Sequence, residues 1–69
     1  MIAYFKLMHR TSQLQRAIFL ATELFDGDIN QALVWIGTPH PHFFNFSPAQ
    51  YVLGGNGKSL INWLEERLG

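Results

Sequence analysis

No cysteine occurs among the 69 residues of this chain. Disulfide bonds are therefore excluded, and so is a metal site built from thiolates. A chain this short buries only about 60% of the surface that it exposes when unfolded, so we expect one domain with a small core. Because nothing in the composition calls for an oxidising compartment, we expect a cytoplasmic protein.

Charged residues are also scarce. Lys, Arg, Asp and Glu make up 14% of the chain, against about 25% in an average soluble domain. Five basic and five acidic side chains cancel to a formal net charge of zero, and neither sign forms a run. Bulk electrostatics therefore predicts no binding to nucleic acid or to an anionic membrane. With 48% hydrophobic residues, part of the apolar surface is expected to meet another chain.

No apolar run approaches the roughly 20 residues that a membrane helix needs. The apolar N-terminus is interrupted by Lys6 and followed by His9 and Arg10, so we expect no secretory signal there. We expect a soluble protein with no membrane contact.

Residues 1–10 are expected to form an N-terminal arm or a helix extension in front of a domain over residues 11–69. Helix is favoured over an extended arm for residues 2–8. Because a homodimer would cover apolar surface that this core cannot, self-association is expected through Ile2, Tyr4, Phe5 and Met8.

Helical spacing dominates the sequence, and no window alternates long enough to predict a strand. A first helix is predicted over residues 11–25, with Ser12 as its cap and Gly27 just beyond its end. Asp28 is predicted to cap the next helix, with Gln31 completing a capping box. We therefore expect an all-α fold, a small bundle of four or five short helices.

Two proline signals flank an aromatic turn. Segment 37–39, Gly-Thr-Pro, is predicted to end the second helix, because proline cannot continue a helix from within. Ser47 and Pro48 are predicted to begin a new helix as its cap and first residue. The turn between them carries phenylalanines that need a core or a partner to cover them. Since Phe43 and Phe44 are adjacent, at least one of them is expected to be exposed.

A short helix is predicted over residues 47–53 and a last helix over 58–68. The glycine-rich segment 54–57 joins them, and Asn56 is predicted to cap the second. With the Lys and Ser that follow, this segment resembles part of a phosphate-binding loop, but Val52 stands where that pattern requires glycine. A turn between helices is therefore the better interpretation.

Catalytic or metal-binding constellations are not evident. His40 and His42 supply two ligands at most, whereas metal sites need three or four, so a solvated loop is the better interpretation. No serine lies in a motif that pairs it with a histidine and an acid. We expect no enzyme activity, no catalytic residue, no cofactor and no metal.

A series of residues spread from 21 to 64 is weak in its single elements but more specific in its order and spacing: Ala21, Leu24, Phe25, Asp28, Ala32, Trp35, Ile36, Thr38, Pro39, His40, Phe46, Ser47, Pro48, Tyr51, Val52, Leu53, Gly57, Ile61 and Leu64. This series resembles the toxin-binding domain of the Xre/MbcA/ParS antitoxins over residues 17–69. Two differences, His40 for the commoner asparagine and residues 45–46 where glycine is frequent, are expected to change the turn rather than the fold.

In that family the domain neutralises a RES-type toxin, which degrades NAD, by covering it and placing the antitoxin's C-terminal end at the active-site entrance. The resemblance implies a cognate RES-type toxin as partner, bound by Lys58, Trp63, Arg67, Leu68 and Gly69. It implies a scaffold that orients this surface, formed by Phe25, Trp35, Pro39, Ser47, Pro48 and Gly57.

Members of that family usually carry an N-terminal DNA-binding-like domain, whereas only residues 1–10 stand in front of the domain predicted over residues 11–69 here. We therefore expect no nucleic-acid binding through this chain alone. The alternative interpretation is a non-enzymatic adaptor or structural domain of the same fold that binds another protein.

Overall fold

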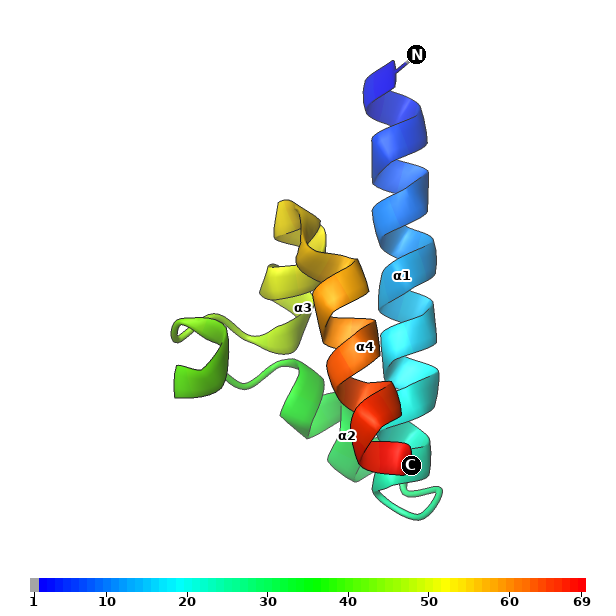
Figure 1. Cartoon of the computed structure of the whole chain (residues 1–69), viewed down its shortest axis with the longest axis vertical. Helices are drawn as coiled ribbons and strands as arrows, with labels where there is room; N and C mark the ends of the chain where they lie inside the picture. Colours follow the sequence, from blue (N-terminus) through cyan, green and yellow to red (C-terminus); the bar gives the residue numbers. More distant parts are fainter. Residues whose placement is uncertain (1) are drawn as a thin grey trace.

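The computed structural model describes the backbone of residues 2–69 and the side chains of residues 8–69. The elements in order are the α-helices α1 (Ile2–Leu24) and α2 (Ile29–Ile36), a 3-10 turn η1 (Pro41–Phe43), the short α3 (Pro48–Tyr51), a wide turn η2 (Val52–Asn56), and α4 (Gly57–Leu68). Within the described residues there is no strand, only an isolated bridge between His40 and Phe46. The all-α prediction is confirmed (Figure 1).

The predicted bundle of four or five short helices does not match the arrangement. Three helices, α1, α2 and α4, build the fold, and the other helical segments are single turns. The helix predicted over residues 47–53 is only the single turn α3 followed by the wide turn η2. In addition, α1 is one continuous helix of 23 residues, which leaves no separate N-terminal helix. Residues 2–24 contain neither proline nor glycine, the residues most costly inside a helix. Ser12 therefore lies inside α1, and the prediction that it caps a helix is wrong.

The helix α1 crosses the boundary that we drew between residues 10 and 11, so the N-terminal segment extends the first helix. Its N-terminal half projects beyond the other elements (Figure 1), and the molecule measures 38 × 22 × 22 Å. Among the residues predicted for self-association, the side chains of Ile2, Tyr4 and Phe5 lie outside the described ones. Met8 is 53% exposed.

The corner between α1 and α2 follows local chemistry. Gly27 adopts a φ of 88°, and its amide donates to the carbonyl of Thr22 at 2.8 Å, which closes α1. The carboxylate of Asp28 then accepts a hydrogen bond from the Gln31 amide and caps α2. The Gln31 side chain bonds to the Asp28 carboxylate instead of to its backbone. The cap is confirmed, but the predicted capping box is only half formed.

The predicted boundaries around the aromatic turn are confirmed. Helix α2 ends at Ile36, and Ser47 begins α3 with a complete capping box. The Gln50 amide donates to the Ser47 hydroxyl at 3.1 Å, and the Ser47 amide donates to the Gln50 side chain at 3.0 Å. Pro48 occupies the first turn of α3 and is buried. This segment therefore begins in a single, well-defined conformation.

Between α3 and α4 the helical path kinks at Gly55, whose φ of 104° is left-handed. Asn56 stands at the cap position of α4, but among the described residues its side chain makes no capping hydrogen bond. The predicted side-chain cap is therefore wrong. Gly57 is buried against α1, and a Cβ there would overlap the side chain of Gln13. Glycine thus permits α4 to start close against α1.

The core lies mainly between α1 and α4, which run side by side. Leu60 and Leu64 of α4 are fully buried against the small residues Ala17 and Ala21 of α1. The other buried apolar residues are Leu20, Ala32, Ile36, Phe43 and Val52. In the part of the chain that the structure describes, no helix has the length and hydrophobicity required to cross a bilayer.

Candidate protein-binding surface at the end of α4

Two tryptophans join α2 to α4. The indole rings of Trp35 and Trp63 stack with centroids 5.8 Å apart and planes inclined by 13°. Phe43 of η1 presents an edge contact to both rings, with centroids 6.1 Å from Trp35 and 5.3 Å from Trp63. Three elements are therefore held together by one aromatic cluster, formed by Trp35, Phe43 and Trp63 with the two histidines described next.

His40 and His42 belong to this cluster. The half-buried His40 ring lies 5.4 Å from Trp35, and its Nε2 is 3.3 Å from the Trp35 carbonyl oxygen. The His42 ring lies 5.4 Å from Trp63. The prediction of a solvated His-Pro-His loop is therefore wrong for His40. The bridge from the His40 amide to the Phe46 carbonyl, 3.2 Å long, closes the loop and holds the histidine against α2.

Trp63 supports the next turn of α4. The guanidinium carbon of Arg67 lies 3.5 Å from the centroid of the Trp63 ring, and its Nη1 donates to the Trp63 carbonyl at 3.2 Å. This is a cation–π contact between residues four apart on one helix face. The Trp63 ring is half-buried, and its buried Nε1 has no hydrogen-bond partner among the described residues. Trp63 thus acts as a support, while Arg67 is exposed.

The last residues of α4 are open to solvent. Leu68 is 37% exposed. Gly69 ends the helix with a φ of 93°, and its amide donates a hydrogen bond to the Glu65 carbonyl. The structure brings Trp63 and Arg67 into contact, and Leu68 and Gly69 follow them at the end of the helix. We name these four residues the α4 end surface.

Lys58 is not part of the α4 end surface. It lies in the first turn of α4, about 13 Å along the helix axis from Arg67 at 1.5 Å per residue. There it lines a hollow of about 360 Å³ with His9, Arg10, Gln13 and Gly55. The predicted toxin-binding residues thus fall at the two ends of α4.

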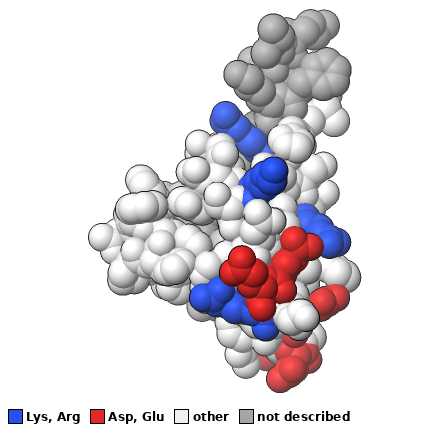
Figure 2. All heavy atoms as spheres, in the orientation of Figure 1, with Lys and Arg blue, Asp and Glu red and all other residues white. Residues whose placement is uncertain are grey.

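Acidic side chains gather near the α4 end surface. In Figure 2 the red atoms occupy the part of the molecule where α4 ends and α1 turns into α2. Arg16 forms an ion pair with Glu65 at 3.6 Å, with both side chains about half exposed. Exposed pairs of this kind stabilise a fold only weakly. The acidic residues of the chain are Glu23, Asp26, Asp28, Glu65 and Glu66.

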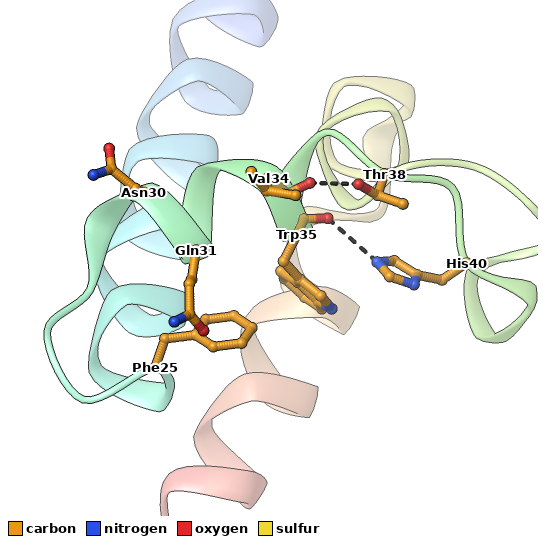
Figure 3. A pocket seen from close by; sticks show the side chains of 7 residues that line it. All are labelled: Phe25, Asn30, Gln31, Val34, Trp35, Thr38 and His40. Atoms are coloured by element: carbon orange, nitrogen blue, oxygen red, sulfur yellow. Dashed lines mark hydrogen bonds between the residues drawn. The ribbon is translucent and has the colours of Figure 1, made fainter.

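A shallow apolar groove runs beside the aromatic cluster (Figure 3). Its volume is about 480 Å³, and it is lined by Phe25, Asn30, Gln31, Val34, Trp35, Thr38 and His40. The hydroxyl of Thr38 donates to the Val34 carbonyl, so the end of α2 forms one wall. Val34 is 71% exposed, and the lining contains no Lys, Arg, Asp or Glu.

Two phenylalanines of the aromatic turn face solvent. Phe44 is 75% exposed and has a φ of 57°, while Phe46 is 53% exposed. Because Phe43 turns inward and is 4% exposed, the expectation that one of the adjacent rings is exposed is confirmed. The exposed pair borders a hollow of about 350 Å³ lined also by Gln50, Tyr51, Gly54 and Asn56.

The residues expected to form the scaffold occupy different environments. Ser47, Pro48 and Gly57 are buried, and Phe25 and Trp35 are half-buried against the core. Pro39 is exposed, so its contribution is confined to the turn after α2. Phe43 and the two histidines join this scaffold although no helical periodicity pointed to them. Their only signal was the concentration of rings in segment 40–46.

No family model, curated protein or solved structure matches this chain. The antitoxin-like interpretation therefore depends on the order of residues in the sequence. Among the described side chains, no group of three His, Cys, Asp or Glu is placed to hold a metal ion. The clearest chemical features of the described surface are exposed apolar residues beside a packed aromatic cluster.

Proposed function

We propose that this chain is a non-enzymatic protein-binding domain that neutralises a RES-type toxin by steric occlusion. The α4 end surface would cover the entrance to the toxin's active site. The observation that carries the proposal is the way Trp63 holds Arg67 at 3.5 Å while Leu68 stays exposed at the end of the helix. Since such a toxin degrades NAD, the domain would act in the cytoplasm.

The support beneath this surface is packed against two other helices. Leu60 and Leu64 anchor α4 against α1, and the stack of Trp63 on Trp35 anchors it against α2. A helix end that is already ordered loses little conformational entropy on binding. Arginine and tryptophan are also enriched among residues that contribute most to protein interfaces. These features favour Arg67 and Leu68 as direct contacts and Trp63 as their support.

Co-expression with a RES-type toxin tests the proposal. The unaltered chain is expected to restore growth and to co-purify with the toxin. The double variant Arg67→Glu with Leu68→Glu should do neither, because both changes are confined to the exposed end of α4. A matched control is Ser59→Glu, which alters an exposed residue in the first turn of the same helix. Undiminished rescue by the double variant would contradict occlusion through this surface.

A second candidate function is that of an adaptor domain that binds another protein through the aromatic turn. The exposure of Phe44, 75%, and Phe46, 53%, favours it. The bridge between His40 and Phe46 and the buried Phe43 ring fix the turn that carries them. In this case Phe44→Ser with Phe46→Ser should abolish complex formation, while the Arg67 and Leu68 variant retains it.

A further inference from the structure

A basic hollow lies where α1 passes the first turn of α4. Its volume is about 360 Å³, and it is lined by His9, Arg10, Gln13, Gly55 and Lys58. Gln13 follows His9 by four residues and Arg10 by three, so these side chains share one side of α1. Two cations from different helices, Arg10 and Lys58, therefore border one cavity. We name this cavity the basic hollow.

The positive charge of the basic hollow is not neutralised within the described part of the chain. The ion pair found among the described side chains joins Arg16 to Glu65, and neither Arg10 nor Lys58 has an acidic partner there. The sequence has no Asp or Glu in residues 1–22 or 29–64. On the face shown in Figure 2, the described surface next to the grey atoms has blue atoms and no red ones.

Arg10 is held in place at the edge of the basic hollow. Its side chain is half-buried, and its Nη1 donates to the Leu53 carbonyl at 3.2 Å. Its Nη2 lies over the kink of η2, 3.7 Å from the position that a Cβ would take on Gly55. A guanidinium has five N–H donors, so the bond to Leu53 leaves most of them available to a ligand. Because the side chain is already ordered, it loses little conformational entropy on binding.

We propose that the basic hollow binds the phosphate group of a phosphomonoester. The Arg10 guanidinium and the Lys58 ammonium would donate to different phosphate oxygens, and the Gln13 side chain has neutral donors to add. A phosphomonoester carries a charge of about −1.5 to −2 at pH 7, which matches two cations. A carboxylate carries a single charge. The hollow also lies at the N-terminal end of α4, where the helix dipole favours an anion.

The surroundings favour one terminal phosphate over a nucleic-acid backbone. Nucleic-acid binding depends on several neutralised phosphates, and the described basic side chains form no track that leads away from the hollow. Arg16 is paired with Glu65, and Arg67 lies on Trp63 at the other end of α4. The phosphate could belong to a soluble molecule or to a lipid head group.

Titration of the isotope-labelled full chain with inorganic phosphate, followed by NMR, tests the proposal. The amide signals of Gly55 and Lys58 should shift and reach saturation, whereas acetate at the same ionic strength should leave them nearly unshifted. Lys58→Gln should weaken phosphate binding by at least about 10-fold, because a charge-assisted hydrogen bond is lost. Arg16→Gln is the matched control, since it removes the same charge from an exposed position of α1 outside the hollow. It should leave the affinity unchanged.

Two results would overturn the proposal. Equal responses to phosphate and acetate would indicate a general effect of counter-ions, and equal losses in Lys58→Gln and Arg16→Gln would indicate an effect of net charge. Lys58 is exposed, so its replacement should leave the thermal unfolding unchanged. Arg10→Gln is the second variant and should also weaken binding by at least about 10-fold. Circular dichroism shows whether the loss of its bond to Leu53 alters the fold.

Two further probes distinguish the sources of the phosphate. Binding of phenyl phosphate without retention of the chain on vesicles would assign the group to a soluble molecule. Retention on vesicles of phosphatidylcholine with phosphatidic acid, but not with phosphatidylglycerol, would assign it to a lipid. The double variant Arg67→Glu with Leu68→Glu should bind phosphate like the unaltered chain, because both residues lie outside the hollow. Phosphate binding and toxin neutralisation can therefore fail separately.

Discussion

Trp35 and Trp63 stack with their ring centroids 5.8 Å apart. One ring belongs to α2 and the other to α4, so this single contact ties together helices that are distant in the sequence. Phe43 from the intervening turn packs its edge on both. The cluster therefore links the stability of the domain to the position of the α4 end surface.

Replacement of Trp63 by alanine is expected to lower the free energy of unfolding by about 2–4 kcal/mol, because a half-buried ring and its stack are lost. Trp63→Phe should lower it less, since it retains a ring and removes an indole N–H that lacks a partner among the described residues. Urea unfolding followed by circular dichroism measures both. Equal losses in the two variants would argue against the importance of the aromatic packing.

Gly57→Ala is expected to destabilise the domain by about 1–3 kcal/mol, because its Cβ would overlap Gln13 on α1. Gly54→Ala is the matched control, since a Cβ at Gly54 meets no described atom within 4 Å. Thermal unfolding of both variants, of Gln13→Ala and of Gly57→Ala with Gln13→Ala tests the interpretation. Gly57→Ala should cost less stability when combined with Gln13→Ala than beside Gln13, and an equal cost would indicate another cause.

Ser47→Ala should cost about 1 kcal/mol of stability, the usual value for the loss of a helix cap. The capping box with Gln50 is lost in this variant, and the amide of Gln50 loses the Ser47 hydroxyl. Ser59→Ala, an exposed change in the first turn of α4, should stay within about 0.5 kcal/mol of the unaltered chain. Denaturant midpoints compare the two, and indistinguishable midpoints would count against the cap.

The ion pair between Arg16 and Glu65 is expected to contribute less than about 0.5 kcal/mol to the free energy of unfolding. The charged atoms are 3.6 Å apart, and both side chains are about half exposed, so water screens their attraction. A double-mutant cycle with alanine at both positions measures the coupling energy, and added salt should reduce it further. A coupling above about 1 kcal/mol would show that this surface is better ordered than its exposure indicates.

The prediction from sequence succeeded where the chemistry is local. The α2 cap at Asp28, the left-handed Gly27, the end of α2 before Gly37 and the capping box at Ser47 are all confirmed. It failed where a local signal had competitors. Ser12 has a side chain that can cap a helix, but the residues on both sides of it favour helix. The helix α1 therefore continues through this position.

The candidate site was only partly predictable. The spacing of α4 placed Trp63 and Arg67 four residues apart, and the structure brings them into contact. Nothing in the local pattern indicated that His40 would pack on Trp35, because that contact requires the loop to close through Phe46. The grouping of Lys58 with Arg67 came from the resemblance alone. The structure separates them because they lie at opposite ends of one helix.

The amino-acid sequence alone determined the helical class and most helix ends, since backbone caps, prolines and glycines act over three or four residues. Only the tertiary structure decided which aromatic rings are buried and which side of α1 is left open. Those outcomes depend on contacts between α1, α2 and α4, whose residues are far apart in the chain. Phe43 and Phe44 illustrate the difference, because neighbours of identical chemistry are 4% and 75% exposed. Their exposed fractions differ because only the Phe43 ring packs on the two tryptophans.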